Sequence, residues 1–323
     1  NTEKLCKFLA ANNKQYALGV VSGQSYAKIF ERASQPTGAW GASTTGESAG
    51  AARVEDLFIE YEDIIFGGRG TNVLWGYAYL TNTFTDTAYT FASGVFNTTA
   101  PALVGIVHSK YNTLFVAAGF RIHKKTSGGT VTANWSLALT LPSNLVITSM
   151  CEYGNYLAIA CRPLYTNGHS KVFLWDTNSA VNDISEAIDW GRESIFAIEE
   201  IDGVIVGASG TLRIEGTDTG LLTPKIFLKH VQGEGTRLIQ EFTLTVADYR
   251  VSTTKQKANN RLLFRLSAEI NSVRYDAIWS LGRNKYGEWA VSMERFFNGD
   301  TAITNARPRG FQLLGDFMTL AYT

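Results

Sequence analysis

The chain repeats one short pattern seven times, in which a polar or glycine-containing turn precedes an apolar run. The copies begin at residues 13, 62, 111, 154, 202, 259 and 315, so their starts lie 43 to 57 residues apart. β-branched and aromatic side chains are frequent in these runs, which favours strands over short helices. A period of about 40–50 residues is the length of one four-stranded propeller blade. The spacing therefore predicts an all-β chain.

Further β-rich runs flank each copy, with one upstream and two downstream. In the third unit these runs are residues 103–107, 120–124 and 135–139. The repeated strand is nearly all apolar, whereas the downstream strands alternate polar and apolar residues, as expected if only the inner strands are buried on both faces. We predict a β-propeller of six or seven four-stranded antiparallel blades.

The two ends of the chain leave the blade number open. Residues 310–314 and 317–321 supply only the inner two strands of a seventh unit. N-terminal strands would have to complete that blade, because an open sheet edge invites pairing with other chains. Residues 3–11 read as an inner strand or as one or two helical turns. We expect residues 1–323 to form a single propeller domain, closed by N- and C-terminal strands and cut from a longer chain or processed, since no initiator Met is present.

Composition excludes several classes of protein. The 29 Lys and Arg balance the 29 Asp and Glu, and no basic run suggests nucleic-acid binding by bulk charge. Hydrophobic residues make up 45%, enough for a substantial core, and no apolar stretch approaches the about 18 residues of a membrane span. Three cysteines cannot form a disulfide framework. The three are Cys6, Cys151 and Cys161. We expect Cys151 and Cys161 to be buried free thiols; the alternative is that they face each other on adjacent strands.

Carboxylates near the ends of inner strands are the candidates for glycoside hydrolysis, which needs two carboxyl groups about 5–9.5 Å apart. They are Asp56, Glu60, Glu152, Glu199, Glu200 and Asp248. We expect the pairs Glu60-Tyr61, Glu152-Tyr153 and Asp248-Tyr249 to mark one repeat position, which turn solvation explains better than a unique active site. We therefore assign no catalytic residue and expect a protein that is not an enzyme.

Other motifs have both a chemical and a structural interpretation, and the structural one is favoured for each. The four histidines lack metal-ligand spacing and read as solvated or core residues. Residues 176–183 loosely resemble a calcium loop but also fit a capped turn. Residues 67–70 (GGRG) could cradle an anion or form a turn between strands. The basic clusters at 123–125 and 250–257 read as solvated loops. Most tryptophans are expected to pack blades together. No metal or cofactor is predicted.

Binding is expected where connections break the period, because the repeated strands are committed to packing. Two such places are residues 36–51, which are rich in Gly, Ser, Ala and Thr, and the enlarged sixth unit with residues 250–260 and 283–288. Arginine and aromatic residues are typical of interface hot spots. The candidate interface residues are Arg283, Lys285, Tyr286, Trp289 and Trp40. Tolerated surface insertions are the alternative. We also expect Gly67, Gly119 and Gly207 to need positive φ or close backbone approach.

Residues 277–291 (AIWSLGRNKYGEWAV) look like a strand, a turn and a second strand that opens with Trp. Together with residues 188–191 (IDWG) and 201–207 (IDGVIVG), this segment resembles the propeller proteins in the tails of short-tailed bacteriophages, of the hub or nozzle type. The strand at 171–176 (KVFLWD) resembles the strand ending in Trp-Asp of another propeller family, but it occurs once, so we do not place the chain there.

The tail-protein resemblance implies a structural protein of the virion that self-associates in a ring and binds neighbouring tail proteins. We therefore predict a non-enzymatic assembly or interaction propeller, located in the virion, that needs neither nucleic acid nor a membrane span. The alternative function is a carbohydrate-binding or glycoside-hydrolysing propeller that uses inner-strand carboxylates, with a glycan as partner. The alternative locations are the extracellular space and the cytoplasm.

Overall fold

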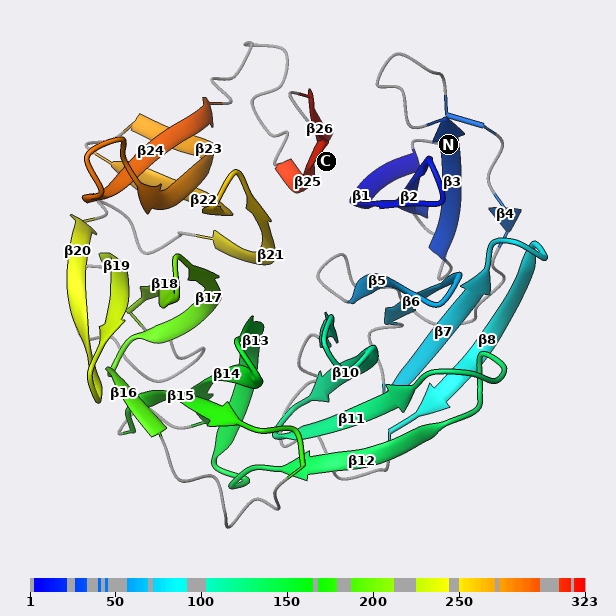
Figure 1. Cartoon of the computed structure of the whole chain (residues 1–323). Helices are drawn as coiled ribbons and strands as arrows, with labels where there is room; N and C mark the ends of the chain where they lie inside the picture. The colour runs from blue at the N-terminus through cyan, green and yellow to red at the C-terminus, as the bar shows by residue number, and fades with distance from the viewer. Residues whose placement is uncertain are drawn as a thin grey trace. The chain divides into compact units, whose positions relative to one another are not determined.

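A computed structural model of the chain describes residues 3–21, 27–33, 40–41, 44–45, 57–68, 72–91, 103–164, 168–178, 187–211, 225–243, 250–270, 273–296, 308–314 and 317–322. These residues form antiparallel strands, and no helix occurs among them. Six sheets have four strands each and follow one another along the chain (Figure 1). The fold is thus an all-β propeller with six four-stranded antiparallel blades, as the repeat predicted.

The chain divides into two compact units, Asn1–Leu139 with Ile303–Thr323, and Thr140–Ala302. The first unit holds three four-stranded sheets and one hairpin. Their strands are β1 (Glu3–Ala11), β2 (Lys14–Val21), β3 (Ala27–Ala33) and β4 (Thr44–Thr45); β5 (Phe58–Tyr61), β6 (Ile64–Gly68), β7 (Val73–Ala78) and β8 (Thr83–Thr90); β9 (Val104–His108), β10 (Thr113–Ala118), β11 (Arg121–Thr126) and β12 (Trp135–Thr140); and the hairpin β25 (Pro308–Leu314) and β26 (Phe317–Tyr322).

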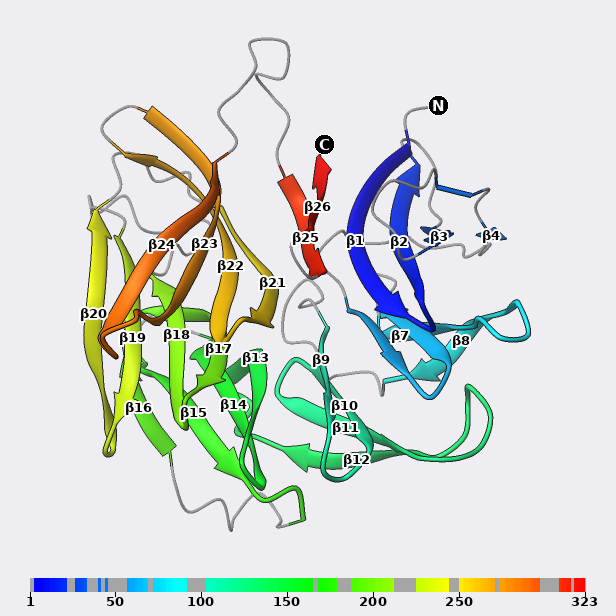
Figure 2. The ribbon, with the colours of Figure 1, turned by 45° about the horizontal axis from the view of Figure 1, so that its top comes forward.

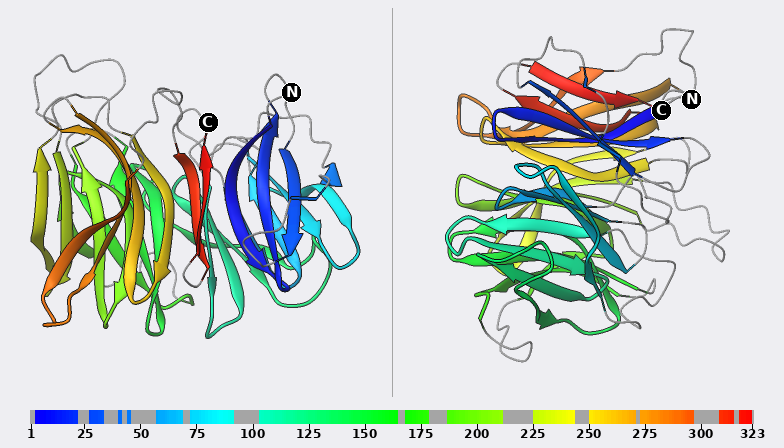
Figure 3. Two further views of the ribbon diagram at one scale, coloured as in Figure 1. Left: turned by 90° about the horizontal axis from the view of Figure 1, so that it is seen from above. Right: turned by 90° about the vertical axis from the view of Figure 1, so that its right-hand side faces the viewer.

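The second unit holds three four-stranded sheets, whose twisted strands are seen from further directions in Figures 2 and 3. Their strands are β13 (Leu145–Tyr153), β14 (Tyr156–Pro163), β15 (Ser170–Trp175) and β16 (Ala187–Gly191); β17 (Ser194–Ile201), β18 (Val204–Gly210), β19 (Lys225–Gln232) and β20 (Gly235–Thr243); and β21 (Arg250–Ala258), β22 (Arg261–Ile270), β23 (Val273–Arg283) and β24 (Trp289–Phe296).

The repeated pattern found in the sequence is the second strand of every sheet and the turn that precedes it. The strands concerned are β2, β6, β10, β14, β18, β22 and β26. Several of the turns have two central residues, as at Asn12-Asn13, Glu62-Asp63 and Asn259-Asn260, where both φ angles are positive. Two positive φ angles match the twist of a tight hairpin and favour Asn, Asp and Gly. The residues that these turns require therefore recur once per sheet, which gives the sequence its period.

The burial gradient agrees with the predicted order of strands. Every residue of β6 and of β10 is buried, whereas every residue of β20 is exposed or half-buried. Trp75, Trp175 and Trp190 are fully buried, which supports the expectation that most tryptophans pack the blades. Each unit has its own apolar clusters between adjacent sheets.

The two ends of the chain belong to different sheets among the described strands. Residues 3–11 form strand β1, not helical turns, and β1 to β4 make a sheet of their own. Among the described strands, β25 and β26 pair only with each other, while β1 lies against both (Figure 1). The two-residue turn Asn12-Asn13 pairs β1 with β2, so the paired edge of β1 is already occupied within its own sheet. The further proposition that residues 1–323 act as one closed domain stays a prediction.

Two expectations about single residues are confirmed. Gly119 has a φ of 63°, and a Cβ at Gly67 or Gly207 would lie within 3 Å of a neighbouring side chain or backbone atom. Cys151 and Cys161 are buried free thiols. They do not face each other, since Cys151 pairs with Ala158.

Candidate interaction site

The turn between β23 and β24 is fixed by its own hydrogen bonds. The side-chain Oδ1 of Asn284 accepts from the backbone N–H of Tyr286 at 2.9 Å and of Glu288 at 3.0 Å. The backbone N–H of Asn284 donates to the carbonyl of Glu288 at 2.9 Å, and that of Gly287 donates to the carbonyl of Asn284 at 3.0 Å. With φ at +81°, Gly287 supplies the left-handed residue that closes the turn. The five residues 284–288, here called the 284–288 tip, therefore form a preorganised hairpin end.

The tip presents an aromatic ring to solvent. Tyr286 is 75% exposed, the largest exposed fraction among the exposed large hydrophobic side chains of the described residues. The Nζ of Lys285 lies 4.9 Å from the centroid of the Tyr286 ring, within the range of a cation–π contact. An exposed tyrosine on an ordered turn, with a cation beside it, has the composition of an interface anchor, because tyrosine binds with little loss of conformational entropy.

Stacked side chains support the base of the tip. The guanidinium of Arg283 lies 4.2 Å from the ring centroid of Trp289, and the imidazole of His230 stacks on the same ring at 5.4 Å. Arg283 Nη1 also donates to the carbonyl of Gly287 at 2.5 Å. Arg283 and Trp289 thus act within the chain, where they hold the tip in place.

The tip is also tied to the preceding sheet. Because strands alternate in direction, the first and third turns of a blade lie at the same end of the sheet. Asp202, in the turn between β17 and β18, has an Oδ2 3.6 Å from Arg283 Nε and accepts a hydrogen bond from Asn260 Nδ2. Two blades therefore brace one tip.

The structure brings together four of the five predicted interface residues, namely Arg283, Lys285, Tyr286 and Trp289. Trp40 belongs to the other compact unit, where its ring stacks on Phe8 at 5.9 Å and Arg32 lies 4.4 Å from its centroid. Most of the predicted loop at 36–51 falls outside the described residues.

Sequence reasoning missed Asp202, His230 and Asn284 as parts of this site. Asp202 was read only as a turn residue of the repeat. An Asn at the start of a turn is a signal for side-chain to backbone hydrogen bonding, which could have predicted the order of the tip. No sequence signal relates His230 to Trp289, since they come from different sheets.

Three of the candidate carboxylates, Glu60, Glu199 and Glu200, serve turns and ion pairs. Glu60 accepts from the backbone N–H of Asp63 at 3.1 Å, and Glu200 accepts from that of Gly203 at 2.5 Å. Burial would raise the pKa of Glu200, but the hydrogen bonds from Lys257 and Gly203 hold that pKa below its usual value. A general acid needs the opposite shift, so Glu200 is poorly suited to protonate a leaving group.

The three predicted Glu-Tyr and Asp-Tyr pairs do not all occupy the same position in their blades. Glu60 and Glu152 share one repeat position, one residue before the end of the first strand. Asp248 does not share it, because β21 begins at Arg250 and Lys257 occupies that position. The prediction for Asp248 is wrong because the dipeptide Asp248-Tyr249 resembles the Glu-Tyr pairs in sequence but precedes its strand. Asp248 and Asp56 fall outside the described residues.

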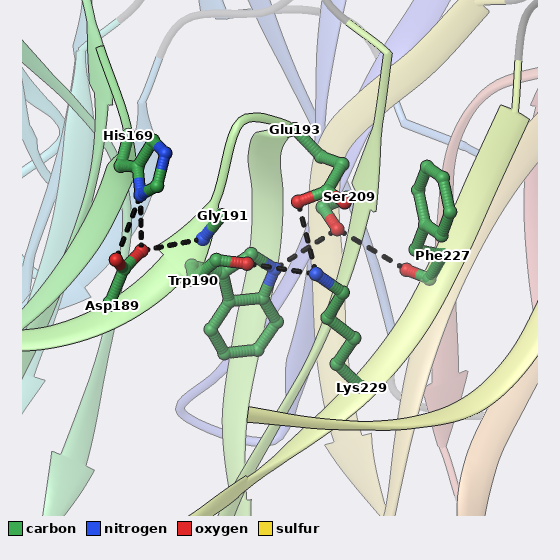
Figure 4. Close-up of polar contacts among 8 residues, drawn as sticks. All are labelled: His169, Asp189, Trp190, Gly191, Glu193, Ser209, Phe227 and Lys229. Atoms are coloured by element: carbon green, nitrogen blue, oxygen red, sulfur yellow. Dashed lines mark hydrogen bonds and ion pairs between the residues drawn. The ribbon is translucent and has the colours of Figure 1, made fainter. Parts of the chain in front are cut away.

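A polar network joins the outer strand of one blade to the next blade, around Trp190 (Figure 4). The indole N–H of Trp190 donates to Ser209 Oγ at 3.0 Å, and Lys229 Nζ donates to the Trp190 carbonyl at 2.8 Å and to Glu193 at 3.0 Å. Beside it, His169 Nδ1 lies 2.8 Å from the Asp189 carboxylate. The contacts of Trp190 with Ser209 and Lys229 join two blades, whereas His169 and Asp189 lie on one blade and are both about half exposed.

The remaining motifs have structural roles. Asp176 Oδ1 accepts from the Asn178 N–H at 2.9 Å, which makes the predicted capped turn; residues 179–186 lie outside the described ranges. In the glycine motif, Gly67 and Gly68 belong to β6. The expectation of a solvated loop at 123–125 is wrong, because β11 buries His123 and Lys125, and the Lys125 ammonium donates to the carbonyls of Thr130 and Ala133. The run at 250–257 forms β21, also not a loop.

The described ranges hold neither a metal-binding cluster nor a membrane-spanning helix. They contain no group of three or more His, Cys, Asp or Glu side chains placed to hold a metal ion. Within the same residues, no helix is long and apolar enough to cross a membrane.

Comparisons with known proteins define the fold alone. No protein-family model and no curated protein sequence matches the chain. Among solved structures, the designed protein Ika8 is 11% identical with a TM-score of 0.53, over 99% of this chain and 94% of that one. The Pan2 WD40 domain of Neurospora crassa is 9% identical with a TM-score of 0.53, over 99% and 86%. The N-terminal domain of Nup159 is 12% identical with a TM-score of 0.50, over 99% and 88%. The chain thus shares the propeller fold of proteins with very different sequences.

Proposed function

We propose that the protein is a non-enzymatic interaction propeller that docks a protein partner on the 284–288 tip. The observation that carries this proposal is the ordered turn that holds Tyr286 three-quarters exposed. An aromatic side chain kept exposed by a rigid support gains contact area on binding without an ordering cost. The engagement of Glu199 and Glu200 in ion pairs further favours a binding role over a hydrolytic one.

We further propose that the partners are virion proteins, and that the chain is a component of a phage tail that self-associates in a ring. This finer assignment depends on the resemblance of residues 277–291 to tail hub and nozzle propellers. The 284–288 tip lies in the middle of that segment, so the same residues support the class of protein and the place of binding. A location in the virion follows from the same assignment.

Tyr286→Ala is the sharpest test of the docking surface. Arg283→Ala would also disturb Trp289 and Asp202, whereas the Tyr286 ring contacts solvent and Lys285, so its loss should leave the melting temperature unchanged. We expect Tyr286→Ala to weaken binding to purified tail proteins at least about tenfold, as for a hot-spot residue. Tyr156→Ala, at another exposed tyrosine (45%), is the matched control and should bind normally.

Three outcomes would count against the proposal. Normal binding by Tyr286→Ala would place the docking surface elsewhere. Equal losses in Tyr286→Ala and Tyr156→Ala would indicate a general surface effect. Saturable binding of the wild-type chain to glycans, with no binding to any tail protein, would favour the carbohydrate-binding alternative.

A further inference from the structure

The first strands of three successive blades, β13, β17 and β21, are neighbours in the second unit. Met150, Ile198 and Lys255 occupy the same position in these strands, three residues before the last residue of each. Their partners on the second strands are Ile159, Gly207 and Phe264, respectively. The fold therefore places two backbone carbonyls and one lysine at a common level.

The ammonium of Lys255 lies among three oxygen atoms. Lys255 Nζ is 2.7 Å from the carbonyl oxygen of Met150, 2.5 Å from that of Ile198 and 2.9 Å from Glu199 Oε2. An ammonium group has three N–H donors, and each has one acceptor here. Only 17% of the Lys255 side chain and 15% of the Glu199 side chain are exposed.

The two backbone carbonyls need a donor because of where they lie in the sheet. A first strand has a paired edge toward the second strand, and the carbonyl and N–H groups of its other edge must find partners outside the sheet. The N–H of Ile198 donates to Ser149 Oγ of the preceding blade at 3.1 Å. The carbonyl of Ile198 receives its donor from Lys255 of the following blade, so one residue is satisfied from both sides.

We propose that the carbonyls of Met150 and Ile198 and the carboxylate of Glu199 form a binding site for a primary ammonium ion, which the chain fills with its own Lys255. The nearby Lys257 differs, because its Nζ pairs with Glu200 at 2.6 Å and its side chain is 40% exposed. Lys257 is an exposed ion pair, whereas Lys255 occupies a three-oxygen site. Removal of the Lys255 side chain should leave that site open to an external ligand of the same chemistry.

Chemical rescue tests this site. Lys255→Ala removes three carbons and the ammonium nitrogen, which together match n-propylammonium. The variant should lose about 5–10 °C in melting temperature, since it leaves a partly buried carboxylate without its partner. We expect n-propylammonium chloride to restore much of this loss with a saturating dose dependence. Tetramethylammonium chloride, which has no N–H donors, should not restore it at equal ionic strength.

Two variants control the rescue. Lys257→Ala should show no specific response to n-propylammonium. Lys255→Met fills the space of the side chain with apolar atoms, so it should also show no saturable rescue. If Lys255→Ala is unfolded in buffer, recovery of its β-sheet circular dichroism on adding n-propylammonium becomes the readout. Equal responses to the two salts, equal rescue of Lys255→Ala and Lys257→Ala, or no recovery would overturn the proposal.

Discussion

Gly67 leaves the space that the indole of Trp75 occupies on the adjacent strand. The two residues are paired between β6 and β7, and a Cβ at Gly67 would lie 2.0 Å from Cζ2 of Trp75. Trp75 has no room to withdraw, because it is buried, its N–H donates to the Gly68 carbonyl at 3.0 Å, and it stacks on Phe84 at 5.5 Å. The absence of a side chain at residue 67 is therefore a packing requirement.

Gly67→Ala should destabilise the protein by about 3 kcal/mol, the upper range for overpacking of a close-packed core. Urea unfolding followed by tryptophan fluorescence measures the change. Gly235→Ala is the matched control, since no atom lies within 4 Å of the added Cβ and its φ is not in the left-handed region. Equal stability of the two variants would show that Trp75 moves freely aside.

The histidine buried on β11 makes stability depend on pH. His123 accepts or donates one hydrogen bond with the hydroxyl of Tyr89 at 2.9 Å, and its ring packs on Phe91. Burial, with a smaller contribution from Arg121, lowers the pKa of His123 to about 4. The unfolded chain binds the proton below about pH 6.5, whereas the folded chain resists it until about pH 4.

Stability should therefore fall as the pH decreases from about 6.5 to 4, by about 2 kcal/mol between pH 7 and pH 5. Urea unfolding at these two pH values gives the difference. His123→Gln should reduce this pH dependence, while His169→Gln, at the half-exposed pair with Asp189, should retain most of it. A pH dependence that is the same in wild type and His123→Gln would assign the effect to other groups.

The repeat could be predicted from sequence because it depends on local chemistry. Turns such as Asn12-Asn13 and Asn259-Asn260 require residues that tolerate positive φ, and the strands after them are buried on both faces. These two requirements recur in every blade. The order of the blades and the positions of their strands could therefore be predicted from turn residues and apolar runs alone.

The side-chain contacts between blades could not be predicted from local sequence. Lys255 reaches Met150 over a separation of 105 residues, from a basic cluster that resembles a solvated loop in the sequence. Which oxygen a long side chain reaches depends on the positions of separate sheets. The same limit applies to the 284–288 tip, whose exposed residues were predicted from composition but whose supports, Asp202 and His230, come from another blade.

Cys151 and Cys161 should be unreactive toward thiol reagents in the folded protein. Both are fully buried, and burial raises the pKa of each thiol well above its ordinary value, so almost no thiolate forms at neutral pH. We expect iodoacetamide to modify the peptides that contain them only after denaturation, as measured by mass spectrometry. Rapid modification of either peptide under native conditions would show that its strand opens readily.

Asp202 has an unfavourable backbone conformation, and its side chain contacts the next blade. Its φ is 52°, and its carboxylate reaches Asn260 and Arg283. Glu62 holds the same first position of its turn, also at a φ of 52°, and accepts from the Gly128 N–H of the next blade at 2.9 Å. Two carboxylates at equivalent turn positions thus join successive blades.

Comparison of Ala and Gly at residue 202 separates the contact from the backbone conformation. Asp202→Ala loses both contacts and keeps a Cβ at positive φ, so we expect a destabilisation of about 2 kcal/mol. Asp202→Gly loses the same contacts but gains about 1 kcal/mol because Gly adopts positive φ at little cost. Thermal and urea unfolding should rank the stabilities as wild type, then Asp202→Gly, then Asp202→Ala. The pair Glu62→Gly and Glu62→Ala should follow the same order in the other unit. A glycine variant more stable than wild type at either position would show that the carboxylate contact contributes less than the strained turn costs.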